Sequence, residues 1–180
     1  FPGEDPRAEV VQEIHHQVRR LDETIRDLLT FAKPPRPHPA PLDLREFAER
    51  ILRVLAEEPD LKRHRLELVI PYGTVVRADP QLLENILVNL LLNAGQALGS
   101  RPGRIRLEAR EQADKTLVSV TDDGPGIAED ALPRLFKPFF TTKAQGTGLG
   151  LAVVHKFVLA MGGKIEVKTG PGQGATFIVV

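Results

Sequence analysis

Residues 122–151, DDGPGIAEDALPRLFKPFFTTKAQGTGLGL, contain two clusters of glycine on either side of a long loop. The first cluster, Asp122–Ile127, follows a stretch that alternates like a β-strand, and the second, Gly146–Leu151, leads into an apolar stretch with helical spacing. Because glycine has no Cβ, its backbone amides can approach a phosphate closely, and the unpaired amides of a helix N-terminus attract anions. The pattern therefore indicates a phosphate-binding site, although flexible turns would explain either cluster taken alone.

Residues 128–145 join the two clusters and contain Phe136, Phe139 and Phe140. Loops of about 20 residues are uncommon in compact domains unless they have a function. Three phenyl rings also need something to pack against, so we expect the loop to lie down on the domain as a lid when a ligand fills the site. A structural role, in which the rings anchor the loop, is compatible with this interpretation.

A second polar pattern lies on the helix that is predicted to begin after Asp79-Pro80. Asn85, Asn89 and Asn93 follow one another at intervals of four residues, which places them on one stripe of the helix. Apolar residues fill most positions around them, and buried amides need hydrogen-bond partners or ligands. A neutral amide oxygen suits a Mg²⁺ ion that is also bound to phosphates. The stripe therefore predicts a metal–phosphate site.

The pattern of the surrounding chain predicts an α+β fold. We expect helices over residues 43–57, 80–98 and 149–161, and strands over 65–70, 74–78, 104–110, 116–121, 164–168 and 175–180. The strands come in antiparallel pairs between helices, which favours a two-layer α/β sandwich with the helices on one face of a mixed sheet. A doubly wound nucleotide fold would alternate single strands with single helices, and this sequence does not.

The N-terminal part of the chain has a different character. Residues 6–33 carry apolar side chains at alternating steps of three and four, the heptad pattern of a coiled-coil-like helix that pairs with another helix. The members of this seam are Val11, Ile14, Val18, Leu21, Ile25 and Leu28. Five of the nine residues of Lys33–Pro41 are proline, which indicates a stiff, extended linker at residues 34–42 before a domain at 43–180.

Composition argues against several classes of function. The 180 residues contain 24 basic and 24 acidic side chains, so charge gives no support for a nucleic-acid or membrane-surface partner. The absence of cysteine excludes disulfides and thiolate metal sites. No apolar run reaches the roughly 18 residues needed to span a bilayer. We therefore expect a cytoplasmic domain, whose parent protein is either free or membrane-anchored.

Together these motifs resemble the ATP-binding domain of sensor histidine kinases of two-component systems. Asn89–Ala94 resembles the N box, Asp122–Ile127 the first glycine box and Phe136–Phe140 the F box. Gly146–Leu151 resembles the second glycine box and Gly170–Phe177 the terminal glycine turn, so all five follow the family's order. The resemblance covers residues 43–180. The wording of Phe139–Lys143 is most similar to the nitrogen-regulatory type of sensor kinase.

The resemblance implies the Bergerat ATP-binding fold, with ATP and Mg²⁺ as cofactors. Asp122 would accept the adenine amino group, Asn93 would hold Mg²⁺ with Asn89 assisting, and Lys143 would reach the γ-phosphate. Glycines would shape the adenine side (Gly124, Gly126) and bracket the phosphates (Gly146, Gly148, Gly150). The further residues that the resemblance assigns to ATP binding are Ile127, Phe139, Thr142, Thr147, Leu149 and Thr176.

One position distinguishes the chain from related ATPases. The gyrase, mismatch-repair and heat-shock members of the wider superfamily carry a water-activating glutamate one turn before the Mg²⁺ asparagine, and here that position is Asn89. An amide cannot take a proton at neutral pH, so we expect transfer to a protein side chain instead of hydrolysis. Two residues depart from the family pattern. Gly95 replaces a bulky apolar residue, and Asp123 replaces the common asparagine. The charge of Asp123 would either weaken nucleotide binding or face solvent.

The acceptor histidine of such a kinase is followed by an acidic residue and, five positions on, by a proline. None of the five histidines matches this pattern: His15, His16, His38, His64 and His155. Leu28–Pro34 is similar to the end of the second dimerisation helix, so residues 1–33 are identified as that helix. The acceptor-bearing first helix is expected before Phe1, and we expect the chain to bind ATP without phosphorylating itself.

The resemblance implies three partners: ATP, the dimerisation helices of the same kinase in a homodimer, and the receiver domain of a response regulator. Two alternatives remain open, namely an anti-sigma serine kinase or other ATPase of the same fold, and a nucleotide-binding module without transfer activity. The heptad helix and the long F-box loop argue against the first. The presence of Asn93, Asp122 and the glycine clusters argues against the second.

Overall fold

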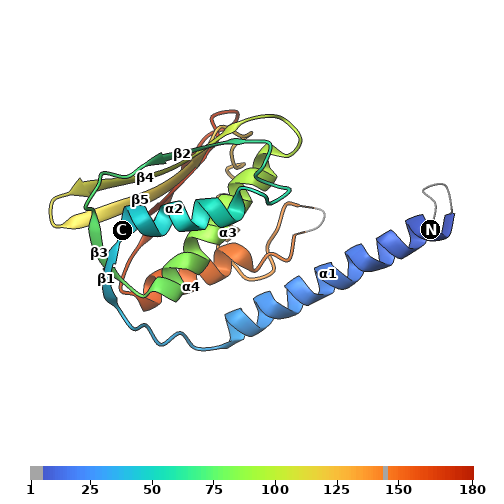
Figure 1. The fold of residues 1–180 in the computed structure, drawn as a ribbon, viewed down its shortest axis with the longest axis horizontal. Helices are drawn as coiled ribbons and strands as arrows, with labels where there is room; N and C mark the ends of the chain where they lie inside the picture. The colour runs from blue at the N-terminus through green and yellow to red at the C-terminus, as the bar shows by residue number, and fades with distance from the viewer. Residues whose placement is uncertain (1–5, 144–145) are drawn as a thin grey trace.

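A computed structural model describes residues 6–143 and 146–180. Within its first helix, α1 (Pro6–Ala32), the described side chains are those of residues 10–15, 17–18, 21–22, 24–25 and 28–32. The helix points away from a rounded body that contains all the other elements (Figure 1). The backbone thus consists of one long helix and one α+β body.

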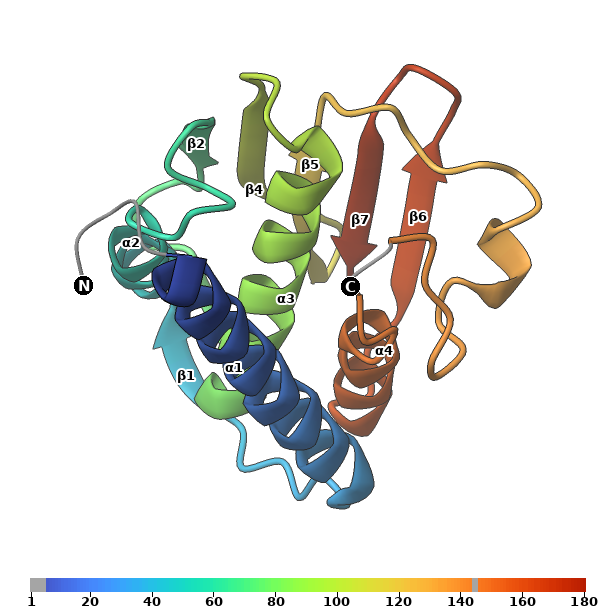
Figure 2. The ribbon, with the colours of Figure 1, turned by 90° about the vertical axis from the view of Figure 1, so that its right-hand side faces the viewer.

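The body is a two-layer sandwich, as the sequence predicts. Five strands form one sheet in the order β2-β4-β5-β7-β6, in which β2 and β4 are parallel and the other neighbours are antiparallel. Helices cover one face of this sheet (Figure 2). The strands are β2 (Arg65–Val69), β4 (Arg104–Gln112), β5 (Lys115–Asp122), β6 (Ile165–Thr169) and β7 (Ala175–Val179), and the helices are α2 (Leu44–Leu55), α3 (Pro80–Leu98) and α4 (Gly150–Ala160).

The pairing of the second and third strands differs from the expected antiparallel pairs. β3 (Val75–Ala78) pairs with β1 (Ala40–Asp43), and the two form a separate antiparallel sheet. β1 includes Ala40–Leu42, which the sequence assigns to the linker. The link between β2 and β3 contains Pro71, whose missing N–H cannot extend a ladder, and Arg45 Nη1 donates to the carbonyl oxygen of Ile70 at 2.6 Å. The chain thus leaves the large sheet before β3 begins.

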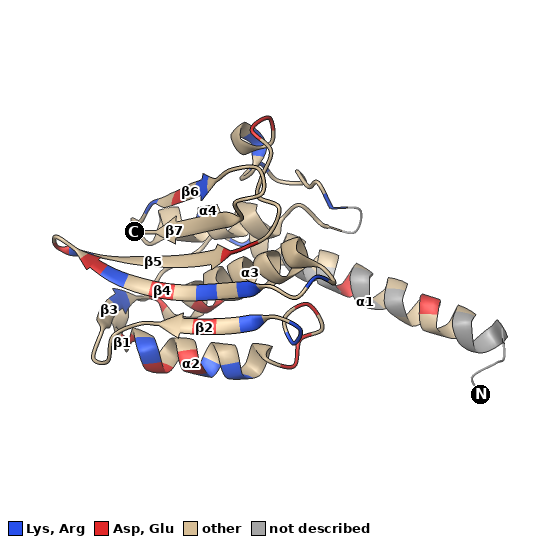
Figure 3. Ribbon diagram, turned by 90° about the horizontal axis from the view of Figure 1, so that it is seen from above, with Lys and Arg blue, Asp and Glu red and all other residues tan. Residues whose placement is uncertain are grey.

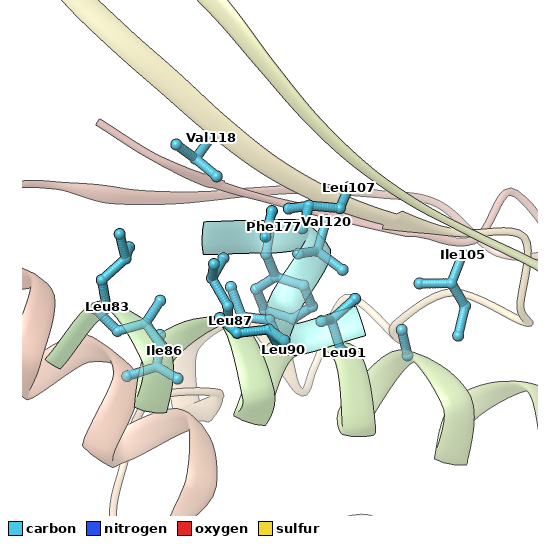
Figure 4. Close-up of a cluster of buried hydrophobic side chains, with 14 of the residues drawn as sticks. Leu83, Ile86, Leu87, Leu90, Leu91, Ile105, Leu107, Val118, Val120 and Phe177 are labelled. Carbon is cyan, nitrogen blue, oxygen red and sulfur yellow. The ribbon is translucent and has the colours of Figure 1, made fainter. Parts of the chain in front are cut away.

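The core lies between α3 and the sheet (Figure 4). Apolar side chains recur along α3 at helical spacing and meet the inward residues of β4, β5 and β7. The buried residues at this contact include Leu83, Ile86, Leu87, Leu90, Leu91, Ile105, Leu107, Val118, Val120 and Phe177. The burial of these side chains holds α3 in a fixed position, so the rest of the helix surface can carry the site.

Arg and Glu residues recur along β2 and β4 (Figure 3). On β4 they alternate with the buried apolar residues, so their side chains point to the opposite face of the sheet. Glu108 accepts from Arg110 Nε at 2.7 Å and lies 3.3 Å from Arg106 Nε, and Arg65 Nε lies 3.0 Å from Glu67. Exposed ion pairs of this kind contribute little to stability. They keep the uncovered face of the sheet polar.

The apolar seam of α1 is exposed along its described length, with exposed fractions between 41% and 60% for its six members. Near its C-terminal end the helix contacts α4, where the Nζ of Lys156 donates to the carbonyl oxygen of Phe31 and, at 2.9 Å, to that of Lys33. Two carbonyls at the end of α1 are thus bound by one cation. The seam itself has the exposure that pairing with another helix requires.

Asp79 joins the linker to the start of α3. Its Oδ1 caps the helix by accepting from the N–H groups of Gln81 and Leu82 at 2.9 and 3.0 Å, and its Oδ2 accepts from the N–H of His38 at 2.7 Å. Burial acts to raise the pKa of Asp79, but these three hydrogen bonds outweigh it and hold the pKa below its usual value. The stabilisation is present at neutral pH and is lost as the pH falls through this lowered pKa.

We expect Asp79→Ala to lower the free energy of unfolding by about 2 kcal/mol at pH 7, the upper range for loss of an N-cap. Urea denaturation followed by circular dichroism measures this change. Asp43→Ala is the matched control, because Asp43 caps α2 with a single bond to the N–H of Glu46 and is exposed. Its loss should cost under about 1 kcal/mol. Equal losses in the two variants would show that the bond to His38 adds nothing.

Candidate functional site

The polar stripe of α3 lies against the N-terminus of α4. The side-chain nitrogen of Asn89 donates to the carbonyl oxygen of Asn85 at 2.8 Å, which leaves its oxygen free to face α4. A Cβ built on Gly150 would lie 2.7 Å from the side-chain oxygen of Asn89 and 3.8 Å from the side-chain nitrogen of Asn93. A side chain at the start of α4 would therefore displace the amide of Asn89, and glycine leaves that amide in place. The predicted metal ligands and the predicted phosphate-binding helix terminus are brought together.

Asp122 stands at the end of β5 with 5% of its surface exposed. Its Oδ1 accepts from the N–H of Gly124 at 2.9 Å. Burial raises the pKa of this carboxyl and the nearby charge of Asp123 adds to the rise, against the hydrogen bonds from the N–H groups of Gly124 and Ala175. A carboxylate in this setting has acceptor capacity left for a ligand that donates.

The first glycine cluster is held between α3 and the turn after β6. Gly124 lies against α3, because a Cβ built on it would be 3.6 Å from the Cβ of Ala97, one turn beyond Asn93. The N–H of Ile127 donates to Oγ1 of Thr169 at 2.9 Å, and the N–H of Gly172 donates to the carbonyl oxygen of Pro125 at 2.8 Å. Ile127 also packs on the core. α3 is therefore the floor of the site, with the second glycine cluster beside its middle and the first beside its C-terminal end.

Asp123 is exposed, and its carboxylate is directed away from the site. Its Oδ1 accepts from the N–H of Arg104 at 2.8 Å, and its carbonyl oxygen accepts from Arg101 at 2.8 Å. The side chain is thus turned toward the start of β4. Its remaining influence on the site is the charge that it places near Asp122.

The second glycine cluster meets the F-box segment backbone to backbone. The N–H of Phe139 donates to the carbonyl oxygen of Gly148 at 2.9 Å, and a Cβ on Gly148 would lie 2.5 Å from the carbonyl carbon of Phe139. Both residues have positive φ, which is rare for a phenylalanine. Leu149 is buried in the core, and its N–H faces Oγ1 of Thr147 at 3.3 Å.

Two of the three F-box rings pack as the sequence predicts. Phe136 stacks on His155 of α4 with ring centroids 5.1 Å apart, and Arg134 lies over the ring of Phe140 at 4.6 Å. Phe139 differs, because 67% of its surface is exposed. Thr142 is exposed as well. Neither of these two predicted ATP-binding side chains is buried in the site.

Lys143 reaches the polar stripe of α3. Its Nζ donates to Oδ1 of Asn93 at 2.8 Å and to Oε1 of Gln96 at 2.6 Å. Burial lowers the pKa of Lys143, and the charges of Asp60 and Asp122 oppose that shift. The oxygen predicted to bind Mg²⁺ therefore already attracts a cation. The described residues contain no group of three or more His, Cys, Asp or Glu side chains placed for a metal. A Mg²⁺ ion at Asn93 would be completed by water and by phosphate oxygens of a ligand, as is usual for this ion.

Thr176 is not brought together with Asp122. In the pairing of β5 with β7, Thr176 lies opposite Thr121 and Ala175 lies opposite Asp122. The hydroxyls of Thr121 and Thr176 are 3.0 Å apart, on the face of the sheet that points away from Asp122, because side chains alternate along a strand. Ala175 is the residue of β7 that shares the face of Asp122.

Gln96 is a site residue that the sequence analysis missed. It is a polar residue one turn after Asn93 on a largely apolar helix, and that spacing was the available signal. Its Nε2 donates to Oδ2 of Asp60 at 3.0 Å, a contact between distant parts of the chain that no local pattern indicates.

Comparison with known proteins identifies the family. Residues 78–180 match the family model of histidine kinase-, DNA gyrase B- and HSP90-like ATPases. The chain belongs to this family. The match begins just before Asp79 and includes α3, both glycine clusters and α4, the elements that form the site.

Similarity to sensor kinases extends over nearly the whole chain. Sensor histidine kinase ZraS of Escherichia coli strain K12 is 38% identical over 180 residues, which cover 98% of this chain and 38% of that protein. The chain thus spans under two fifths of the length of this relative. The resemblance to a nitrogen-regulatory subtype remains a prediction.

Two solved structures also match. The structure of ShkA in complex with AMPPNP has a TM-score of 0.81 at 29% identity over 96% of this chain and 38% of that one. The histidine kinase ThkA, solved with the response regulator protein TrrA, has a TM-score of 0.80 at 25% identity over 99% of this chain and 52% of that one. Both matches include α1 together with the ATPase body. In the part of the chain that is described, no helix is long and apolar enough to cross a membrane.

We expect Asp122→Asn to raise the melting temperature of the nucleotide-free protein at pH 7. The folded-state pKa of Asp122 lies above its unfolded value, so ionisation costs stability as the pH rises from the unfolded pKa through the folded one. The difference from wild type should shrink as the pH approaches about 4, the unfolded value. Differential scanning calorimetry across this range measures it. The control is Asp114→Asn in the exposed β4–β5 turn, and an Asp122→Asn protein that melts no higher than that control would show that burial of the Asp122 carboxylate costs no stability.

Proposed function

We propose that this chain is the ATP-binding catalytic part of a sensor histidine kinase, which transfers the γ-phosphoryl group of ATP to a histidine of a dimerisation helix. Relay to an aspartate of a response regulator would follow. The observation that carries the proposal is the meeting of Asn89, Asn93 and Gly150 along the middle of α3, with Asp122 and Gly124 beside its C-terminal end. The helix thus gives the site a metal–phosphate end and a buried carboxylate end.

At the carboxylate end, Asp122 recognises the adenine. Its Oδ1 is held by the N–H of Gly124, so the orientation of the carboxylate is fixed before the ligand arrives. The adenine amino group donates to the remaining acceptor capacity of this carboxylate. Gly124, Gly126 and Ile127 form the wall beside it, and the bonds to Thr169 and Gly172 keep that wall in place.

At the other end, the chain binds the phosphates. The free N–H groups at the start of α4 and its dipole attract the phosphate oxygens, and Gly146 and Gly148 allow the backbone to approach them. Asn93, with Asn89 beside it, supplies amide oxygens for Mg²⁺. The ion, when bound, neutralises charge on the phosphate oxygens during transfer. Lys143 adds a second positive charge for the γ-phosphate.

The choice of an amide at position 89 favours transfer over hydrolysis. A carboxylate there could accept a proton from an attacking water, whereas the side chain of Asn89 has no such capacity at neutral pH. Its nitrogen is committed to the carbonyl oxygen of Asn85. Water at this position therefore stays a weak nucleophile, and a histidine presented from another helix can react instead.

α1 supplies the connection to the dimerisation domain. Its exposed heptad seam fits the second dimerisation helix of a four-helix bundle. The partners would be a second kinase chain, through this bundle, and the receiver domain of a response regulator. We place the domain in the cytoplasm. An anti-sigma serine kinase of the same fold has no evident use for such a helix. A binding module without transfer activity remains the alternative that experiment must exclude.

Asp122→Ala should weaken ATP binding roughly 10- to 100-fold, the factor for losing a hydrogen bond to a charged group in a buried site. Titration calorimetry with ATP and Mg²⁺ measures the change. Asn93→Ala should reduce affinity only when Mg²⁺ is present. The matched control is Asp114→Ala, far from the site in the β4–β5 turn. Unchanged affinity in Asp122→Ala would refute the adenine assignment.

Incubation of the chain with γ-labelled ATP and Mg²⁺ should leave the chain itself unlabelled. His15 is exposed on α1 and the side chain of His16 lies outside the described residues, but neither carries the acceptor pattern. Adding a dimerisation hairpin with an acceptor histidine should produce acid-labile label on that hairpin. Label on His15 or His16 would contradict the first expectation, and ATP binding without any transfer would favour the binding module.

A further inference from the structure

We propose that Asp60 and Gln96 are positioning residues that hold the ammonium group of Lys143 at the metal–phosphate end of the site. This inference deepens the proposed function and rests on it, because it assigns a role in γ-phosphate recognition to two residues outside the resemblance. Four side chains form one continuous series of hydrogen bonds, which we name the Asp60 arm: Asp60 to Gln96 to Lys143 to Asn93.

The arm has a direction that its chemistry fixes. A carboxylate can only accept, so Asp60 Oδ2 binds the Nε2 of Gln96 at 3.0 Å. The amide oxygen of Gln96 must then face the other way, where it accepts from the Nζ of Lys143 at 2.6 Å. Without Asp60, the amide could rotate and present its NH₂ group to the ammonium, which would repel it. Asp60 thus acts on Lys143 through the orientation of Gln96.

Gly95 allows the arm to exist. A Cβ at position 95 would lie 2.2 Å from the carbonyl oxygen of Asp60 and 2.8 Å from Cδ2 of Leu61. Leu61 is fully buried and anchors the loop of residues 56–64 against α3. The bulky apolar residue usual in the family at position 95 would push this loop away. Glycine at position 95 therefore allows this loop to bring the carboxylate of Asp60 beside the site.

The arm gives Lys143 a second anchor beside the metal ligand. The Nζ of Lys143 lies 2.8 Å from Oδ1 of Asn93, the oxygen assigned to Mg²⁺. An ion that takes this oxygen displaces the ammonium by competition and by charge repulsion. Gln96 then remains as the acceptor that keeps Lys143 one turn along α3, within reach of the γ-phosphate. The arm should therefore favour ATP over ADP.

Tryptic cleavage after Lys143 tests the arm without any nucleotide, because the P1 lysine must leave its partners to enter the protease pocket. Gln96→Ala and Asp60→Ala should each speed this cleavage about fivefold, as expected for loss of one ordinary hydrogen bond. Cleavage after Lys62, in the loop of Asp60, and after Lys115, in the β4–β5 turn, should stay unchanged. Glu57→Ala removes an exposed carboxylate from the same loop and should behave like wild type.

Unchanged cleavage after Lys143 in both variants would overturn the proposal. So would an equal acceleration after Lys62 or Lys115, because that would mean general loosening. The cleavage experiment requires no nucleotide, so it tests the arm even if the chain binds no ATP. A failure of the proposed function is therefore distinguishable from a failure of the arm.

Calorimetry with ATP and ADP, each with Mg²⁺, tests the role in recognition. Gln96→Ala and Asp60→Ala should weaken ATP binding by about fivefold and leave ADP binding unchanged. In a Lys143→Ala background, the same substitutions should have no further effect, because the arm acts only through Lys143. Equal losses for ATP and ADP, a loss that persists without Lys143, or tighter ATP binding would each overturn the positioning role.

Discussion

The site depends on the division of α3 into an apolar face and a polar stripe. The apolar face is buried against β4, β5 and β7, and this packing leaves the helix no freedom to rotate or slide. The stripe on the other side is therefore fixed relative to the ends of the strands. Asn89, Asn93 and Gln96 obtain their precision from leucine and isoleucine residues that never meet a ligand.

The loops at the site depend on the same helix. Gly124 and Gly150 each come close to α3, at Ala97 and at Asn89. At Gly150 a side chain would displace the amide of Asn89, and at Gly124 a side chain would crowd Oδ1 of Asp122. The glycine clusters are thus packing features as well as phosphate-binding features. Gly95 shows the same principle in another place, because it admits a loop instead of a ligand.

Much of this arrangement could be predicted from local sequence. The cap at Asp79, the spacing of the asparagines and the alternation of β4 and β5 are all short-range signals, and they place the helices, strands and glycine clusters correctly. Contacts between distant segments gave no such signal. The pairing of β1 with β3, the face on which Thr176 lies and the bond between Asp60 and Gln96 are set by tertiary packing, which periodicity cannot express.

The proline-rich linker is secured at both ends. Lys156 binds the carbonyl oxygen of Lys33, and Asp79 binds the N–H of His38. Only residues 34–37 lie between these anchors, and their fully extended reach from Lys33 to His38 is about 17 Å. The helix is consequently joined to the body by a short linker that proline makes stiff, and not by a long flexible one. A rotation of α1 away from α4 must first break the hydrogen bonds of Lys156. Even then, the length of this linker limits how far the end of α1 can move from the body.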